Sequence, residues 1–505
     1  MTASSNDADQ TPAPTGLRQT AARGMAWAAS QTLIGKSVTF LGYIILATFL
    51  LDQHEFGLYA MALTVSGFAA LIEQAGLRDV LVFRHAKFRR WANAAFWMSL
   101  AAGTLAMLFI AAAAPLASMI YGEPDVLLLL LILALASPLN TLSIVPRASL
   151  LGQLRFRYIA MTDLTVNCSM IVMTVLLAWM GLGPISFVLP KPIMFLFRAV
   201  SFYLAARPKI RLDPQIRRWK YLFRDSAFVL STAGLTQAVL QGDRILLGVF
   251  FTSATLGVYF LANQLSRQVS AMFSHKLNMV FLPSLSKLQS DPVRQTGAFL
   301  RGVTLLAFVT VPACFLIGIL ADPLSTLMDW PDMIVLMQIL AVGGAFHSVG
   351  STIGSLLRAQ GRFGTDLVLA AIRTVLFFAF IIAGAVLGGV IGVAIASTLH
   401  TAVTCGIGFA VATRPGGGTA MTVWRLMAFP LAGSTVAAVV AALVGSVMPP
   451  GTAGEIISML AMTIGMAIVY LLIAWLFARQ TLLELLSTMH SVLPDRFTRR
   501  LASIT

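Results

Sequence analysis

The dominant pattern in the chain is a series of apolar runs separated by short polar segments. A helix of roughly 20 apolar residues crosses the ~30 Å hydrocarbon core of a bilayer, and the runs have this length. We therefore expect an all-α integral membrane protein with about fourteen transmembrane helices. Their approximate ranges are 25–50, 56–77, 93–118, 126–146, 161–181, 185–205, 226–250, 256–280, 298–320, 333–355, 366–386, 389–411, 425–447 and 456–477.

Composition excludes a water-soluble fold. Of the 505 residues, 58% are hydrophobic and 11% are charged, and a soluble domain is far more polar. The three cysteines, Cys168, Cys314 and Cys405, all fall inside predicted spans. They therefore predict neither a disulfide framework nor a metal cluster.

The connections between the spans carry charge of alternating sign. Basic residues gather in every second connection, whereas the others hold acidic residues such as Glu55, Glu123 and Asp332. The positive-inside rule then places both termini in the cytoplasm. Because the basic residues are scattered over short loops, the net charge of +15 reflects membrane topology and not nucleic-acid binding.

The chain also contains an internal repeat. A shift of 200 residues aligns Gly42 with Gly242 and Gly57-Leu58-Tyr59 with Gly257-Val258-Tyr259. An offset of six spans preserves orientation, so the repeat predicts two parallel, pseudo-symmetric bundles with substrate held between them.

These observations divide the chain into six parts. We expect a disordered cytoplasmic arm (1–24), an N-terminal six-helix bundle (25–205), an amphipathic cytoplasmic linker (206–225), a C-terminal six-helix bundle (226–411), two additional transmembrane helices (412–477) and a cytoplasmic tail (478–505). In the linker, basic residues alternate with apolar ones such as Ile216 and Trp219, which favours a segment lying on the membrane surface.

Charge inside the spans is strongly unbalanced. A buried cation costs roughly 2.5–3.5 kcal/mol on insertion scales and normally has a partner. Two intramembrane carboxylates, Glu73 and Asp243, face a larger set of cations. The cations are Lys36, Lys191, Arg198, Arg244, Arg267, Lys276 and Arg373. The missing counter-charge indicates an anionic ligand.

Two predicted spans carry polar stripes at steps of three or four residues, which place each set on one helix face. The stripes are Gly234, Gln237, Gln241, Arg244 and Gly248 in the seventh span, and Asn263, Arg267, Ser270, Ser274 and Asn278 in the eighth. Such a stripe lines either an aqueous cavity or a partner helix.

The substrate-binding candidates combine these stripes with cations of the first half. They are Lys36, Lys191, Arg198, Gln237, Gln241, Arg244, Asn263 and Arg267. Asp243 is a candidate for ion coupling; alternatively, it neutralises a nearby cation such as Arg244, Lys191 or Arg267.

Several motifs resemble one family. Gly24 and Trp27 precede Glu55-Phe56-Gly57-Leu58-Tyr59-Ala60, and Gly76-Leu77 leads into a basic loop. Asp243-Arg244-Ile245-Leu246-Leu247-Gly248 precedes Leu256-Gly257-Val258-Tyr259 in the second half. In this order, the motifs resemble the polysaccharide (Wzx-type) flippases of the multidrug/oligosaccharidyl-lipid/polysaccharide exporter superfamily, over nearly the whole chain.

The resemblance implies a V-shaped two-bundle fold in the bacterial inner membrane. It implies flipping of undecaprenyl-pyrophosphate-linked glycan units for exopolysaccharide, capsule or lipopolysaccharide biosynthesis. A polysaccharide polymerase and a chain-length regulator are candidate partners, and a proton or a sodium ion is the candidate coupling ion. Independently, arginine suits phosphate oxygens because its planar fork binds them bidentately.

Other functions fit the residues less well. A glycine-rich nucleotide loop and a catalytic constellation do not stand out, so we expect a transporter without cofactor, not an enzyme. A multidrug cation exporter should concentrate carboxylates in its interior, and a non-transporting scaffold has no need of a charged interior. Export of another anionic lipid, such as a peptidoglycan precursor, remains the main alternative.

Overall fold

The computed structural model describes residues 31, 34–74, 88–153, 155–208, 210–211, 213–216, 219–447 and 452–492. Throughout these residues the regular structure is helical and contains no strand, which confirms the predicted all-α class. The predicted arm 1–24 and the side chain of Lys276 lie outside the described part of the chain.

The first half of the chain, called the N-half below, contains eight described helices. They are the helix Ile34–Phe49, α2 (Gln53–Gln74), α4 (Phe88–Tyr121), α5 (Asp125–Thr141), α6 (Ile144–Gly152), α7 (Phe156–Trp179), α8 (Ile185–Val188) and α9 (Pro190–Ala206).

The second half, called the C-half, runs from α10 to α16. Its helices are α10 (Trp219–Phe250), α11 (Ser253–Ser286), α12 (Pro292–Ile319), α13 (Ala321–Met328), α14 (Met333–Gly350), α15 (Ile353–Ala359) and α16 (Phe363–Thr413). A short 3-10 turn, Arg414–Gly416, then leads to α17 (Ala420–Gly445), α18 (Thr452–Phe477) and α19 (Arg479–Val492).

Helix α16 is a hairpin of two antiparallel legs. The backbone leaves the helical conformation at Gly388 and Gly389, where Gly389 has a φ of 59° that favours glycine. The legs then pack backbone to backbone, because a Cβ on Gly392 would lie 2.1 Å from the carbonyl oxygen of Gly384. The hairpin therefore supplies both the eleventh and the twelfth predicted span.

The number of fourteen spans stays a prediction. Among the described residues, ten helices are long and apolar enough to cross a membrane, with α16 counted once. The helices α10 and α11 are absent from that set, and the helix Ile34–Phe49 is shorter. Every predicted range nevertheless contains a helix.

The predicted linker 206–225 overlaps the beginning of α10. Helix α10 begins at Trp219, so the second part of the linker is continuous with the membrane helix. The first part is held against α4 by Asn93, whose side-chain oxygen accepts the backbone N–H of Arg211 at 2.8 Å. Trp97 Nε1 also donates to the carbonyl oxygen of Arg211 at 2.9 Å.

The two halves have equivalent helix starts, as the repeat predicts. At the start of α2, Asp52 and Glu55 each accept the other's backbone N–H through a side-chain oxygen. At the equivalent start of α11, Thr252 accepts the backbone N–H of Thr255. Both arrangements satisfy N–H groups that have no partner within the helix.

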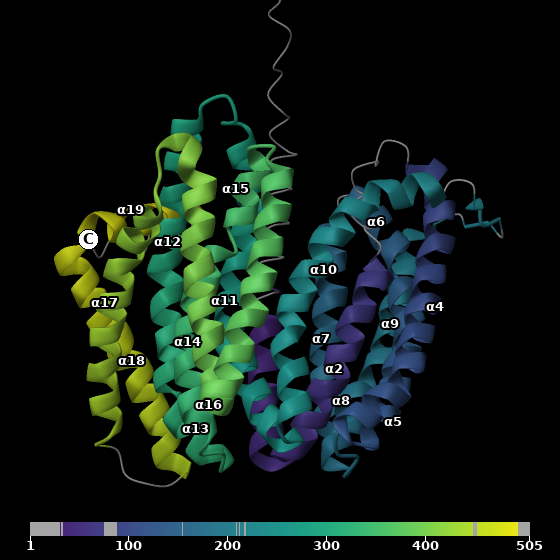
Figure 1. Ribbon diagram of the computed structural model, residues 1–505, viewed down its shortest axis with the longest axis horizontal. Helices are drawn as coiled ribbons and strands as arrows, with labels where there is room; N and C mark the ends of the chain where they lie inside the picture. The colour runs from purple at the N-terminus through teal and green to yellow at the C-terminus, as the bar shows by residue number, and fades with distance from the viewer. Residues whose placement is uncertain are drawn as a thin grey trace, which may run out of the picture.

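Figure 1 shows two groups of helices that converge at the lower edge of the view and diverge toward α6 and α15 at the upper edge, with α10 of the C-half lying beside the N-half helices. The lower edge is called the acidic end below; here His54 lies 3.7 Å from Glu123, and α2 and α11 begin. This arrangement confirms the V-shaped two-bundle fold.

Aromatic side chains fill the convergence of the halves. The ring of Tyr59 stacks on Phe187 at 4.3 Å between centroids and meets Phe260 of the C-half edge-on at 5.7 Å. Phe56 meets Trp330 of the C-half at 5.4 Å. Because such pairs add stability beyond the area that they bury, the acidic end is firmly closed.

The last membrane helices lie outside the V. Helices α17 and α18 pack together and against α12, where the hydroxyl of Tyr470 donates to the carbonyl oxygen of Phe308 at 3.0 Å. They contribute no lining residue to the polar cavity described below.

Candidate functional site

In the N-half, one asparagine joins two charged side chains. Asn140 on α5 donates from Nδ2 to the Glu73 carboxylate on α2 at 2.6 Å, and its Oδ1 accepts a hydrogen bond from Arg198 on α9. The ammonium of Lys191 lies 5.0 Å from the ring centroid of Tyr59, a cation–π contact. Two predicted site residues, Lys191 and Arg198, thus belong to the N-half.

Two residues of the polar stripe on α10, Gln237 and Gln241, face α2. Gln237 Nε2 donates to the carbonyl oxygen of Gly67 at 2.9 Å. A Cβ on Gly67 would lie 2.3 Å from Gln241 Nε2, so both glutamines press on a position without a side chain. Gln268 makes a second contact between the halves, donating to the backbone oxygen of Lys36 at 2.8 Å. Gln237 and Gln241 therefore hold the halves together in this conformation.

Asp243 is a buried carboxylate held by neutral donors. It is 1% exposed. Its Oδ2 accepts the hydroxyl of Tyr259 at 3.0 Å and the amide of Asn263 at 3.2 Å, and its Oδ1 accepts the backbone N–H of Arg244. No described Lys or Arg forms an ion pair with it.

The cation next to Asp243 has other contacts. The guanidinium of Arg244 donates to Gln241 Oε1 at 3.1 Å and lies 5.0 Å from the ring centroid of Phe260. Direct neutralisation of Asp243 by Arg244 is therefore absent from this structure.

Asn263 links Asp243 to Arg267. While its amide donates to the carboxylate, its Oδ1 accepts Arg267 Nε at 2.6 Å. The asparagine therefore presents its donor to the anion and its acceptor to the cation, as both charges require. The contact that the sequence suggested between Asp243 and Arg267 is thus indirect.

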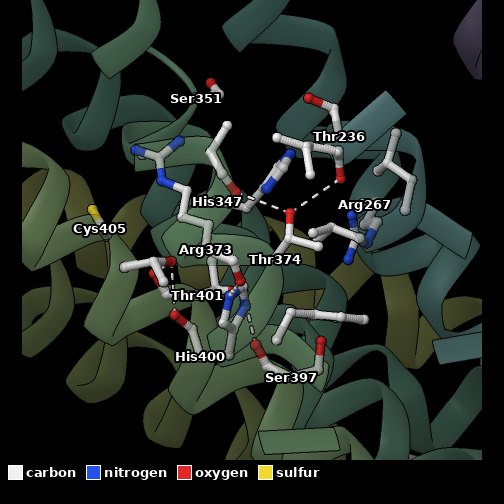
Figure 2. Close-up of a pocket in the computed structure, with 17 residues that line it drawn as sticks. Thr236, Arg267, His347, Ser351, Arg373, Thr374, Ser397, His400, Thr401 and Cys405 are labelled. Carbon is white, nitrogen blue, oxygen red and sulfur yellow. Dashed lines mark hydrogen bonds between the residues drawn. The ribbon is translucent and has the colours of Figure 1, made fainter. Parts of the chain in front are cut away.

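Arg267 borders a cavity of about 170 Å³ whose described lining residues all belong to the C-half. Figure 2 shows its side chains arriving from α10, α11, α14 and both legs of α16. The polar lining residues are Thr236, Arg267, His347, Ser351, Arg373, Thr374, Ser397, His400, Thr401 and Thr404. Carboxylates are absent from the described lining.

The second cation of this cavity, Arg373, was counted among the intramembrane cations but was not among the predicted site residues. Its Nε and Nη2 are buried and have no hydrogen-bond partner among the described residues. Its backbone oxygen lies 3.0 Å from His400 Nε2. The sequence did contain a signal, because Ser397, His400 and Thr404 recur at helical spacing on the second leg of α16.

The predicted site residues thus form three groups and not one cavity. Lys191 and Arg198 lie in the N-half, Lys36, Gln237, Gln241 and Arg244 lie at or near the contact between the halves, and Arg267 lies at the C-half cavity, linked to Asp243 through Asn263.

Two carboxylates that lie near the ends of predicted spans add to the two counted from the sequence. Asp163 forms an ion pair with Arg147 at 2.8 Å. Asp366 lies seven residues before Arg373 on α16, which corresponds to ~10 Å of helix rise.

Known proteins resemble the chain both in sequence and in fold. It is 25% identical to the succinoglycan biosynthesis transport protein ExoT of Rhizobium meliloti (strain 1021) over 395 residues, which cover 77% of this chain and 80% of that protein. It is 23% identical to the lipopolysaccharide biosynthesis protein WzxC of Escherichia coli (strain K12), with 79% and 82% covered.

Among solved structures, the lipid II flippase MurJ in an inward closed conformation matches 90% of this chain and 99% of its own, with a TM-score of 0.72 and 14% identity. An outward-facing multidrug resistance MATE family transporter of the MOP superfamily matches 80% and 96%, with a TM-score of 0.55 and 14% identity. At this identity the likeness shows the fold alone.

The model of the family described as polysaccharide biosynthesis protein matches residues 45–328, more than half of the chain. This match confirms the resemblance that the motifs of the two halves indicated. The chain therefore belongs to the polysaccharide biosynthesis protein family.

Proposed function

We propose that the protein moves a glycan linked to undecaprenyl pyrophosphate from the inner to the outer leaflet of the bacterial inner membrane, for surface polysaccharide biosynthesis. The observation that carries the proposal is the uncompensated positive charge inside the helices. Lys191, Arg244, Arg267 and Arg373 form no ion pair with any described residue. A lipid-linked pyrophosphate supplies the anion that these cations lack.

The contacts between the halves support alternating access. The positive-inside rule places the basic loops in the cytoplasm, so the acidic end faces outward. In this conformation, aromatic and glycine contacts close that end, while the halves diverge at the other (Figure 1). The cargo would enter from the cytoplasmic side and leave when the contact between α2 and α11 opens. Both termini would then be cytoplasmic.

Asp243 is the candidate coupling group. Its carboxylate is buried among neutral donors, so gain of a proton or a sodium ion would change its bonds to Tyr259 and Asn263. Asn263 would pass that change to Arg267. Through Asn263, binding of the coupling ion at Asp243 would therefore affect Arg267, the residue that we propose binds the cargo.

Other cargoes differ in the charge that they require inside the protein. A peptidoglycan-type lipid shares the pyrophosphate, so the cations suit it equally, and only the glycan distinguishes the two. A multidrug cation would meet Arg244, Arg267 and Arg373 as repulsive charges. A polysaccharide polymerase and a chain-length regulator remain candidate partners.

The test is transport in proteoliposomes that contain the purified protein. The assays compare a labelled undecaprenyl-pyrophosphate-linked oligosaccharide, a peptidoglycan precursor lipid and a panel of cationic dyes. We expect movement of the first substrate between leaflets and no dye export. Dye export without movement of either lipid would contradict the proposal, whereas preference for the peptidoglycan precursor would assign the protein to that pathway.

A further inference from the structure

We propose that the C-half cavity is a binding site for a phosphate or diphosphate group, held between Arg373 and Arg267. The inference deepens the proposed function and rests on it, because it assigns a defined place within the C-half to the anionic part of the cargo. The site is separate from the cations of the N-half, since no N-half residue lines the cavity.

The first argument is the unsatisfied guanidinium of Arg373. Buried charged groups normally have hydrogen-bond partners, and an unpaired one is strongly unfavourable. Two buried nitrogen atoms of Arg373 have none among the described residues, and Asp366, on the same helix, forms no ion pair with it. A buried polar group in this state calls for an explanation. Nη2 lies beside Gly408, where an added Cβ would be 2.7 Å away, so a ligand would reach these two atoms only after a shift of the Arg373 side chain.

The second argument is the set of donors that face the cavity. The hydroxyls of Thr374 and Thr401 already donate to the backbone oxygens of Ala370 and Ser397. The donors left for a ligand include N–H groups of Arg267 and Arg373. Planar guanidinium forks match the oxygens of phosphate and not the charge of a metal ion.

The third argument is the arrangement of the arginines. Figure 2 shows the guanidinium groups of Arg373 and Arg267 on opposite sides of the group of lining side chains, with His347 between them. The cavity of about 170 Å³ is more than ten times the ~10–15 Å³ that one water requires. The cavity therefore has room for a group larger than one water molecule beside the two arginines.

Arg267 connects this site to the rest of the candidate path. It uses Nε to hold Asn263, which leaves its remaining N–H groups for the cavity. Arg373 lies on the first leg of α16 and Arg267 on α11, so a bound diphosphate would tie two C-half helices together. Occupancy of the site would then be coupled to the packing of the C-half.

The test is calorimetric titration of the purified full-length protein in lipid nanodiscs with inorganic pyrophosphate. We expect saturable binding by the wild type. Arg373→Gln and Arg267→Gln should each raise Kd at least tenfold, whereas Arg373→Lys should raise it less because a point charge replaces the fork. Arg301→Gln removes the same charge from an exposed position on α12 and should bind as the wild type does.

A second variant keeps the charge and changes only the cavity. Thr401→Leu places an apolar side chain at the cavity wall and should also weaken binding, even if the arginine variants fold poorly. Absence of saturable binding by the wild type, or wild-type binding by folded Arg373→Gln and Thr401→Leu, would overturn the phosphate site.

Two arms identify the source of the phosphate. If undecaprenyl pyrophosphate in the nanodisc competes with inorganic pyrophosphate, the ligand is the head of the lipid carrier; without competition, it is a free anion, and the site itself stands. Flipping of the lipid-linked glycan by the same wild-type preparation is scored separately. If pyrophosphate binds but the lipid-linked glycan is not flipped, the proposed function alone is rejected. If the glycan is flipped but pyrophosphate does not bind, this site alone is rejected.

Discussion

Gly57 and Gly257 lie against each other where α2 packs on α11, and neither position has room for a side chain. A Cβ on Gly57 would lie 1.8 Å from the carbonyl oxygen of Ser253, and one on Gly257 would lie 1.9 Å from that of Gln53. Because Gln53 and Ser253 are also 200 residues apart, the contact is reciprocal. The glycine pair therefore marks the pseudo-two-fold axis between the halves and closes the acidic end.

Replacing Gly57 with Ala should open this contact without unfolding the protein. Overpacking costs roughly 1–3 kcal/mol, which shifts the equilibrium between conformations by about 5- to 150-fold. The readout is disulfide formation between cysteines at His54 and Ser253, whose side chains lie 2.6 Å apart (Nδ1 to Oγ), with the native cysteines replaced. The yield should fall at least fivefold.

Gly297→Ala on α12 provides the control for this substitution, since nothing lies within 4 Å of the added carbon. It should leave both disulfide yield and transport unchanged. An undiminished yield in Gly57→Ala would show that the glycine contact does not determine closure.

Substrate should reduce crosslinking at the acidic end. The repeat makes Glu55 and Thr255 equivalent, and both lie in the first turns of the helices that meet there. Cysteines at these positions, joined by a short bifunctional reagent, should react in the closed conformation and react less when the lipid-linked glycan is added. Crosslinking that is insensitive to both conformation and substrate would count against rocking of the halves.

Exchanging Asp243 and Asn263 should show whether the protein level depends on the number of buried carboxylates or on which of the two positions carries the carboxylate. Asn263→Asp places a second carboxylate beside a buried one, so the protein level in the membrane should fall several-fold. The double variant Asp243→Asn/Asn263→Asp restores a single carboxylate, now next to Arg267, and should recover the level. Immunoblots of membranes measure the protein level of the single and the double variant. Equal levels in all variants would show that the number of carboxylates at this site does not affect folding.

Asp243→Asn alone should leave a folded protein with impaired transport. The amide oxygen can still accept from Tyr259 or Asn263, while the titratable, ion-binding group is lost. Flipping in proteoliposomes is measured under imposed proton and sodium gradients. If the variant responds to both gradients as the wild type does, Asp243 has no coupling role.

Periodicity and length predicted the helices and the repeat well, because both depend on local sequence. Gly42 and Gly242 illustrate this success. Gly42 packs against Ile171 in the fifth predicted span, and Gly242 packs against Phe377 in the eleventh. The two partner spans are thus also six spans apart, as the repeat predicts. The predicted span 226–250 lies within α10, which extends back to Trp219 through the basic residues of the predicted linker.

The partners of the polar residues could not be predicted in the same way. Periodicity shows that Gln237 and Arg267 lie on polar faces, but only packing decides that one meets α2 and the other a cavity. Asn140 and Asn263 were missed as connectors between charges because a single asparagine gives no periodic signal. The cavity requires α16 to fold back on itself, which brings Arg373 near His400.

Arg267 offers the sharpest separation between a structural and a substrate role. If it neutralised Asp243 directly, Arg267→Ala would lower the protein level and Asp243→Asn would rescue it. Since Asn263 lies between them, we expect Arg267→Ala to lose one hydrogen bond, worth ~1–3 kcal/mol, and to remain well expressed but inactive. Asp243→Asn should not restore its activity.

The most direct test of the cationic path is the rate at which well-expressed Arg267→Lys and Arg267→Glu variants flip the lipid-linked glycan in proteoliposomes. Lysine keeps the charge without the bidentate fork and should retain part of the wild-type rate. Glutamate adds repulsion of the pyrophosphate and should abolish transport. Wild-type glycan flipping by Arg267→Glu would contradict the account and remove this residue from the substrate path.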